Sequence, residues 1–261
     1  MNLLAKIKMW VGKYDAQPKT GAMQGASGFT VTVPASLMRL AAPMDVSARA
    51  ATTIPAKYIL LDVVDFTHHR SVEAQTDIVH TLNAIVKSSV QCENIPQEKI
   101  LFLPTGDGLG IVLLSVESPK YPYDTHIQIA LRIISGIYEH NEQMQDAMRQ
   151  FHVRIGLNAH HDTLVTDIND QPNIAGAGIN MAARIMRVAD GNQILVGRAV
   201  YDILQHRENY MHAFTAYEAT LTHNLIIPVY QFVASGHLGL NTDTPRALQT
   251  PQAPTPNTAG S

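Results

Sequence analysis

The sequence contains one cysteine, Cys92, in 261 residues. A single cysteine excludes a disulfide within the chain and fits the reducing cytosol, so we expect a cytoplasmic protein. A formal net charge of −3 gives no basic excess of the kind that attracts nucleic acid, so no nucleic-acid partner is expected. No apolar run approaches the ~18 residues that a membrane-spanning helix needs. What remains is a globular protein, with 46% hydrophobic residues to build a core.

The two ends of the chain differ in composition from its middle. Residues 1–15 carry apolar side chains at helical spacing and predict an amphipathic helix. We expect this helix to pack on its own domain or on a dimer partner, and contact with a membrane surface is the less favoured alternative. Residues 16–55, rich in Gly, Ala, Ser, Thr and Pro, predict a flexible linker. The polar, proline-rich residues 236–261 predict a disordered tail, which leaves the folded domain at residues 56–235.

Within that domain the apolar periodicity alternates between strand and helix. The predicted strands span residues 57–64, 99–103, 109–114, 151–158, 193–196, 213–221 and 226–233. The predicted helices span residues 71–90, 125–148 and 177–188, with a short helix ending near residue 205. This order predicts an α+β fold, a mostly antiparallel sheet with helices on one face and a ferredoxin-like βαββαβ core.

Two aspartates stand out against their apolar surroundings. Asp62 interrupts an apolar strand, where a carboxylate is costly to bury unless hydrogen bonds or a divalent cation compensate it. Asp107 lies between two glycines in LPTGDG, and taken alone it is explained equally well as a turn residue or as a ligand. If the two strands are neighbours, the carboxylates form a site suited to Mg²⁺, with phosphate oxygens completing the shell. Asp65 is explained more simply as the cap of the next helix.

A second polar pair lies on the predicted helix that follows the glycine-rich AGAG. Asn180 and Arg184 are four residues apart, so they share one helix face. An amide and a guanidinium on one face suit the recognition of a ribose and of phosphate charge. Without the two aspartates, the pair would be explained as a solvated helix face.

Four segments, taken in order, resemble a known family. The segments are LDVVDFT, LPTGDG, FHVRIGLN and GAGINMAARI followed by ADGNQILV. Together they resemble the catalytic domain of class III nucleotidyl cyclases, the adenylate and guanylate cyclase family, over residues 57–233. The resemblance implies a homodimer with two symmetric interfacial sites. Each site would convert a nucleoside triphosphate to a 3',5'-cyclic nucleotide and pyrophosphate with two Mg²⁺ or Mn²⁺ ions.

The resemblance also implies roles for individual residues. Asp62, the adjacent Val63 and Asp107 would form the metal site of one subunit. Asn180 would bind the ribose, and Arg184 would stabilise the transition state, both from the other subunit. No protein nucleophile is needed, because phosphoryl transfer depends mainly on positioning and electrostatics.

The implied substrate contacts depart from the purine cyclases at the base. Backbone amides of residues 63–67, among them Phe66 and Thr67, would hold the triphosphate. Leu103 stands where a purine cyclase carries a charged base-reading residue, and Asn173 stands at the partnering base-reading position. Neither standard purine pattern is therefore present.

Tyr58 is a candidate for reading a different base. It shares a strand face with Asp62 at about 13 Å, roughly the span from metal to base in a nucleoside triphosphate. A core aromatic is an equally good explanation. The YxxxD strand followed by LPTGDG is similar to the pyrimidine cyclases of bacterial anti-phage signalling, which make cyclic UMP or cyclic CMP.

The resemblance favours cyclic UMP ahead of cyclic CMP, and implies a separate effector protein that binds the product. Two alternatives stay open. One is a purine cyclase with an atypical base pocket, and the other is a catalytically silent homologue that acts as a regulatory module.

Overall fold

The structure is a computed structural model that describes residues 21–24, 30–33, 52–116, 120–220 and 225–249. The chain divides into two units, Met1–Ala50 and Ala51–Ser261. In the first unit, β1 (Gly21–Gln24) and β2 (Thr30–Val33) pair as an antiparallel hairpin inside the segment predicted as a linker. The helix predicted at residues 1–15 lies outside the described residues.

The second unit is built on an eight-stranded sheet. Its strands are β3 (Thr53–Val63), β4 (Ile100–Pro104), β5 (Gly108–Leu114), β6 (Val153–Thr166), β7 (Pro172–Ala175), β8 (Ile194–Gly197), β9 (Phe214–Thr220) and β10 (Ile226–Phe232). Its helices are α3 (Val72–Gln91), α4 (Thr125–Gln143), α5 (Ala177–Arg187) and α6 (Arg198–Leu204), with short 3₁₀ turns η2 (Gln97–Lys99), η3 (Glu208–Tyr210) and η5 (Arg246–Leu248). No helix of the described residues is both long enough and apolar enough to cross a bilayer.

The strand order is β4-β5-β3-β6-β8-β10-β9, and β7 pairs with β6. Every pairing described in this sheet is antiparallel except that of β6 with β8. The predicted α+β fold with a mostly antiparallel sheet is therefore confirmed. The strands predicted at residues 99–103 and 109–114 are β4 and β5, which pair as an antiparallel hairpin.

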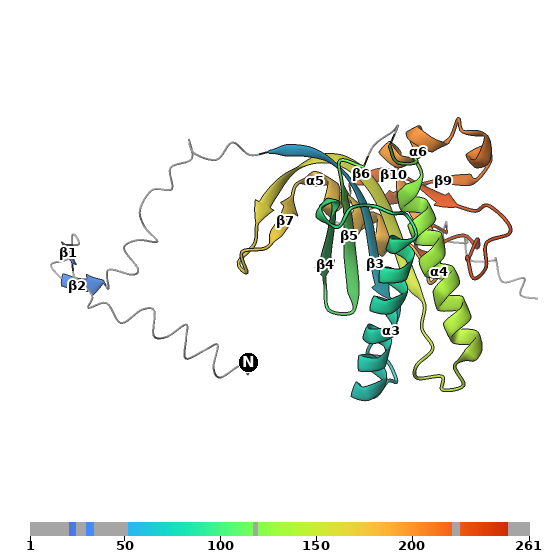
Figure 1. Cartoon of the computed structure of the whole chain (residues 1–261), viewed down its shortest axis with the longest axis horizontal. Helices are drawn as coiled ribbons and strands as arrows, with labels where there is room; N and C mark the ends of the chain where they lie inside the picture. Colours follow the sequence, from blue (N-terminus) through green and yellow to red (C-terminus); the bar gives the residue numbers. More distant parts are fainter. Residues whose placement is uncertain (1–20, 25–29, 34–51, 117–119, 221–224, 250–261) are drawn as a thin grey trace, which may run out of the picture. The chain divides into compact units, whose positions relative to one another are not determined.

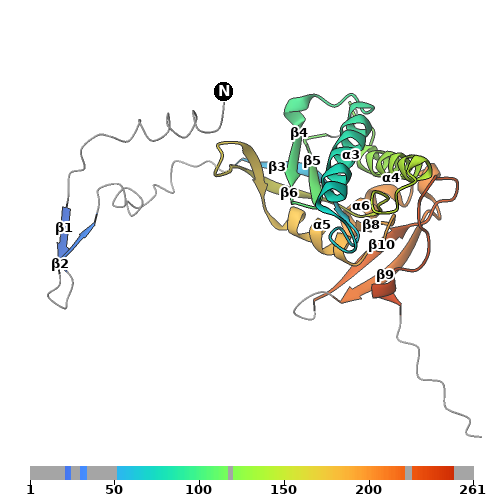
Figure 2. The same cartoon turned by 90° about the horizontal axis from the view of Figure 1, so that it is seen from below.

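Helices cover both faces of the sheet, which corrects the prediction that they lie on one face. Ile59 and Leu61 of β3 pack in one core cluster with α3 and α4, which lie side by side in Figures 1 and 2. Tyr58 and Leu60 belong to a second cluster that includes Ala182 of α5. A strand that is buried on both faces reads as a continuous apolar run, and the unbroken apolar character of β3 is the sequence signal of this arrangement.

The strand predicted at residues 151–158 continues to Thr166, and β7, which pairs with its far half, was not predicted. Beyond Asn158 the side chains of β6 are mostly polar and half-buried or exposed, so the apolar alternation stops while the backbone ladder continues. α4 ends at Gln143 rather than at residue 148. The amide side chain of Asn141 bonds both main-chain groups of Phe151 and fixes the chain where it leaves the helix.

Residues 236–249 pack on the domain, which corrects the prediction of a disordered tail from residue 236. The side-chain amides of Gln193 and Gln231, both fully buried, donate to the carbonyl oxygen of Asp243 at 2.7 and 2.8 Å. Leu248 then packs on the cluster that contains Tyr217 of β9. Side-chain bonds to the backbone leave no periodic apolar pattern, which is why this packing could not be expected from the sequence.

Candidate active site

Asp62 and Asp107 lie next to each other at one end of the sheet. In the antiparallel β3–β5 ladder Asp62 stands opposite Gly108. The Val63 amide donates to the Asp107 carbonyl oxygen at 3.1 Å. The prediction that the two strands are neighbours is confirmed. Two aspartates from distant parts of the chain thus occupy neighbouring positions at this end of the sheet.

The two glycines around Asp107 have different tasks. Gly106 adopts a φ of +101°, in the left-handed region that glycine enters without strain. Gly108 is needed for close approach, because a Cβ there would overlap the Leu61 carbonyl oxygen and lie 3.0 Å from Asp62 Oδ1. The hairpin turn can therefore reach the Asp62 carboxylate only with glycine at position 108.

Asp62 has a basic partner that sequence reasoning missed. Arg154 stands opposite Asp62 in the β3–β6 register. Its Nη2 and Nε donate to Asp62 Oδ2 at 2.6 and 3.1 Å. The Asp62 side chain is 15% exposed, so the guanidinium compensates a largely desolvated carboxylate. The only signal in the sequence was an arginine inside an apolar strand. The register between β3 and β6 that pairs it with Asp62 cannot be predicted from the sequence.

The donor set at this edge suits a hard cation. Carboxylate oxygens are the ligands that Mg²⁺ prefers, and it commonly uses one or two of them together with substrate phosphates. Among the described residues, no group of three or more His, Cys, Asp or Glu side chains is placed to hold a metal ion. A cation at Asp62 and Asp107 would therefore need further oxygens from substrate or water.

The turn after β3 is held by Arg70. Its guanidinium donates to the carbonyl oxygens of Asp65, of Met148 at 3.1 Å and of Gln150 at 3.0 Å. Asp65, with a φ of +52°, lies inside this turn and does not cap the next helix. The Ser71 hydroxyl caps α3 instead, by accepting a main-chain N–H at 3.2 Å. The prediction that Asp65 is a helix cap is wrong.

The amides of this turn are only partly available to a phosphate. Val63 and Val64 already donate to main-chain carbonyls, which corrects the predicted cradle over residues 63–67. No hydrogen bond found among the described residues uses the amide of Phe66 or of Thr67, so these two can meet an anion. The Val63 side chain is buried, and only its carbonyl oxygen could serve a metal.

A buried carboxylate fixes the N-terminus of α5. Asp162 Oδ2 accepts from the amides of Gly178 and Ile179 at 2.9 and 3.3 Å, and from the Tyr58 hydroxyl at 2.6 Å. A Cβ on Gly178 would lie 2.6 Å from Asp162 Oδ2, so the glycine permits this contact. Burial acts to raise the pKa of Asp162, but hydrogen bonds from Tyr58 and His160 outweigh it and the net pKa is lowered.

Tyr58 belongs to the core in this structure. Its side chain is fully buried, and burial followed by the bond to Asp162 raises the pKa of its hydroxyl. The ring packs under α5, where a Cβ on Gly178 would lie 2.7 Å from it. The predicted base contact is therefore not available in this conformation, because no ring surface is open to a ligand.

Asn180 and Arg184 lie on α5, on a different element from the two aspartates. Asn180 is exposed, and its amide donates to the Gly176 carbonyl oxygen at 3.0 Å. Arg184 is partly exposed. Within the part of the chain that the structure describes, no ion pair joins Arg184 to Asp62 or to Asp107. In the described part of one protomer, the two predicted halves of the site are therefore not joined by a direct ion pair.

The two base-reading positions lie on different strands, Leu103 on β4 and Asn173 on β7. Leu103 on β4 and Ile174 on β7 both belong to the apolar cluster under α5. Asn173, next to Ile174, accepts a hydrogen bond from the Ile174 amide at 2.7 Å through its own Oδ1. The two positions that would read a purine base therefore carry an apolar side chain, Leu103, and an amide side chain, Asn173.

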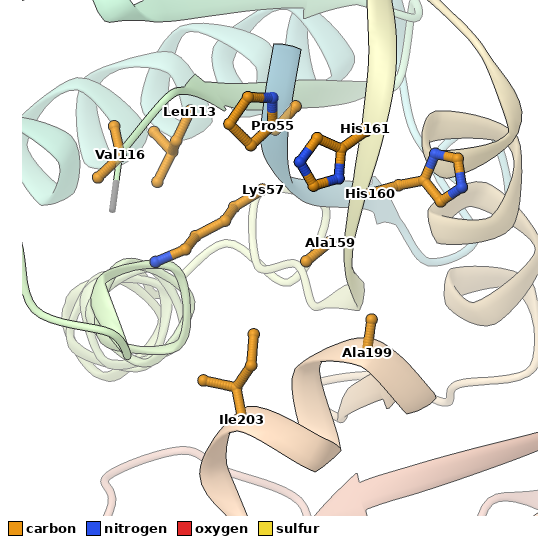
Figure 3. Close-up of a pocket in the computed structure, with 10 residues that line it drawn as sticks. Pro55, Lys57, Leu113, Val116, Ala159, His160, His161, Ala199 and Ile203 are labelled. Atoms are coloured by element: carbon orange, nitrogen blue, oxygen red, sulfur yellow. The ribbon is translucent and has the colours of Figure 1, made fainter. Parts of the chain in front are cut away.

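A separate cavity of about 230 Å³ opens at the other end of β3 (Figure 3). Aliphatic residues make most of its wall, and Lys57 and His161 add polar groups. The Lys57 ammonium donates to the Tyr123 carbonyl oxygen at 3.2 Å. Asp62 lies five positions further along the extended strand than Lys57, about 16 Å away, so this cavity is not part of the carboxylate site.

Comparison with known families matches residues 54–222 to the adenylate and guanylate cyclase catalytic domain. The chain belongs to this family. All residues predicted for the site fall inside the matched segment of this cyclase domain. No curated protein matches the chain.

Solved structures show the same fold. The guanylate cyclase domain of RhGC from Catenaria anguillulae, in complex with GTP, is 17% identical, with 70% of this chain and 99% of that chain covered and a TM-score of 0.53. The adenylyl cyclase CyaB from P. aeruginosa is 15% identical, with 73% and 99% covered and a TM-score of 0.51. An adenylate cyclase from Trypanosoma brucei is 20% identical, with 72% and 93% covered and a TM-score of 0.51. These similarities show the fold of the cyclase domain.

Proposed function

We propose that this cyclase domain converts a nucleoside triphosphate to a 3',5'-cyclic mononucleotide and pyrophosphate. The observation that carries the proposal is that Asp62 and Asp107 occupy neighbouring positions at one end of the sheet, fixed by the register of Asp62 with Gly108 and by the bond from the Val63 amide to Asp107. A fold has no structural need to bring two carboxylates together beside a guanidinium. Family membership supports the same reaction class.

Asp62 and Asp107 would hold two divalent cations, Mg²⁺ or Mn²⁺, with the Val63 carbonyl oxygen as a further ligand. Bound there, the cations would lower the pKa of the ribose 3'-hydroxyl and neutralise charge on the triphosphate. Arg154 compensates Asp62 in the structure described here. Its positive charge is equally suited to a phosphate oxygen.

The remaining groups of the chain position the substrate. The free amides of Phe66 and Thr67, together with Arg154, would bind the triphosphate. The 3'-oxygen then attacks the α-phosphorus in line, and its proton passes to solvent. The bond between the α-phosphorus and the bridging oxygen breaks, and pyrophosphate leaves with that oxygen. Positioning and charge stabilisation are sufficient for this step.

The site would be completed by a second copy of the chain. Asn180 of the partner subunit would orient the ribose, and Arg184 of the partner subunit would stabilise charge that develops on the α-phosphoryl group. The resemblance to class III cyclases, which assigns the aspartates to one subunit and these two residues to the other, supports a homodimer with two shared sites. Removal of one such stabilising group typically lowers kcat by about 10²–10³.

A pyrimidine triphosphate is the proposed substrate, UTP ahead of CTP. Support comes from Leu103 and Asn173, since an apolar residue and an amide replace the charged purine readers. The resemblance to pyrimidine cyclases supports the same choice and a role in cytosolic anti-phage signalling. The product would then act on a separate effector protein that binds cyclic nucleotides.

The test is to incubate the full-length protein with each of the four nucleoside triphosphates and Mn²⁺ and to identify products by mass spectrometry. We expect cyclic UMP, or cyclic CMP, and no product from an Asp107→Ala variant. Cyclic AMP or cyclic GMP alone would refute the pyrimidine assignment and leave the cyclase activity. No cyclic product from any substrate would favour the silent regulatory module.

A further inference from the structure

The C-terminal segment brings an arginine to the edge of the carboxylate site. Arg246 lies beyond residues 54–222, which the cyclase family matches. It lines a polar pocket of about 230 Å³ together with Val64, Asp65, Arg154 and Asp190. Residues from both ends of the domain therefore build this pocket.

The pocket adjoins Asp62 through Arg154. Arg154 forms part of its wall and contacts Asp62 at 2.6 Å. Val64 and Asp65 begin the turn that carries the free amides of Phe66 and Thr67. An anion bound to that turn would therefore extend into the pocket.

Arg246 is exposed, but hydrogen bonds hold it in place. Its amide and its Nε donate to the two oxygens of Asp190 at 2.8 and 3.0 Å. The same segment is anchored at Asn241, whose main-chain N–H donates to the Asn192 carbonyl oxygen at 2.9 Å and whose side chain donates to the Gly191 carbonyl oxygen at 3.1 Å. These hydrogen bonds order the Arg246 side chain before a ligand binds, which lowers the conformational entropy cost of binding.

The unused part of the guanidinium is suited to a phosphate. Of the guanidinium nitrogens, only Nε donates to Asp190. No hydrogen bond found in the described residues uses the terminal Nη groups of Arg246. A guanidinium presents a planar set of donors that binds phosphate oxygens in pairs. The charges of Arg154 and Arg246 are balanced in the pocket wall by the carboxylates of Asp65 and Asp190. The case for a phosphate therefore rests on the unused Nη donors of Arg246 and not on an excess of positive charge.

We propose that Arg246 is a second phosphate-binding arginine, which contacts the terminal phosphates of the substrate and the pyrophosphate product. This inference rests on the proposed function, because it assigns one end of the same substrate. Arg246 thus acts by binding the part of the substrate that leaves, at a distance from the ribose and base.

The experiment measures binding of inorganic triphosphate to the full-length protein by isothermal titration calorimetry. We expect Arg246→Ala to weaken binding roughly fivefold, a modest loss because the side chain is 78% exposed. Arg198→Ala is the matched control, since Arg198 also pairs with an aspartate, at 2.7 Å, and is 63% exposed. This control should bind as the wild type does.

A second variant separates phosphate binding from a merely structural role. Asp190→Asn weakens the anchor of the segment and keeps the guanidinium, so we expect it to bind triphosphate at least as tightly as the wild type. An equal loss in Asp190→Asn and Arg246→Ala would show that only the anchoring matters and would overturn the proposal. The proposal is also overturned if Arg246→Ala binds triphosphate as tightly as Arg198→Ala does, or if the wild type binds no triphosphate.

Failure of the proposed function would look different. A wild type that binds triphosphate through Arg246 but forms no cyclic nucleotide would refute the cyclase activity and support the phosphate site. A wild type that forms cyclic nucleotide, together with an Arg246→Ala variant that binds triphosphate as the wild type does, would support the cyclase activity and refute the phosphate site.

Discussion

The bond between Tyr58 and Asp162 separates two explanations of Tyr58, as a reader of the base or as a support of α5. Tyr58→Phe removes one oxygen and leaves the buried ring in place. The hydroxyl donates to a charged acceptor at 2.6 Å, in a site where Asp162 is only 3% exposed. Asp162 keeps its bonds from Gly178, Ile179 and His160, so it is not left without partners.

The expected cost follows from that geometry. A hydrogen bond to a charged group contributes about 1.5–3 kcal/mol, and the remaining partners place this one at the lower end, about 1.5–2 kcal/mol. For a domain of this size that corresponds to a decrease in Tm of roughly 3–8 °C. Because the bond also fixes the start of the helix that carries Asn180 and Arg184, we expect kcat to fall several-fold without a change in nucleotide preference.

Tyr210→Phe is the matched control. The Tyr210 hydroxyl donates to Asp124 Oδ2, also at 2.6 Å, and Tyr210 is also buried, but the pair lies at the start of α4. Urea unfolding should show a similar loss of stability in both variants, and only Tyr58→Phe should lower kcat. A loss of stability below about 0.5 kcal/mol in Tyr58→Phe would refute the supporting role. A changed nucleotide preference at unchanged stability would instead show that Tyr58 reads the base.

Three further predictions concern single side chains. Gly108→Ala should cost about 1–3 kcal/mol of unfolding free energy and abolish cyclase activity, because the new Cβ would overlap the Leu61 carbonyl oxygen; full activity in this variant would contradict the close approach. Arg154→Ala should raise KM for the nucleotide by about tenfold or more, with a partial recovery in Arg154→Lys, and an unchanged KM would exclude a phosphate contact. Burial, with the charge of Lys57 as a second cause, lowers the pKa of His126 to about 3, so only the unfolded state takes up this proton below its ordinary pKa of about 6.5. The unfolding free energy should therefore fall by about 1.4 kcal/mol per pH unit as pH decreases from about 6.5 towards 3, and chemical denaturation of His126→Phe should show a flatter dependence; equal slopes would contradict this explanation.

Local patterns in the sequence were sufficient for most of the elements and for one half of the site. The strand that carries Asp62 and the turn that carries Asp107 could be predicted because apolar runs and glycines act within a few residues. The Asp62–Arg154 pair could not, because it depends on the register between β3 and β6, which are about ninety residues apart. The same reason hid the Asp162 cap of α5, since a polar residue in a polar part of β6 gives no sign that it is buried.

The position of α5 and the packing of the C-terminal segment were missed for another reason. The continuous apolar run of β3 is typical of a strand buried on both faces, but the prediction placed helices on one face only, and the run does not indicate which helix covers the second face. Residues 236–249 are held by the side chains of Gln193 and Gln231, and such bonds leave no periodic pattern along the chain.

The central claim is a cyclase site shared by two protomers, and complementation tests it most directly. Asp62→Ala and Arg184→Ala chains are each expected to be inactive as homodimers. After unfolding and refolding together in equal amounts, about half of the dimers should be mixed, each with one intact site, which restores about a quarter of the wild-type rate of cyclic nucleotide formation. No recovered activity in a sample shown to contain mixed dimers would contradict the shared site.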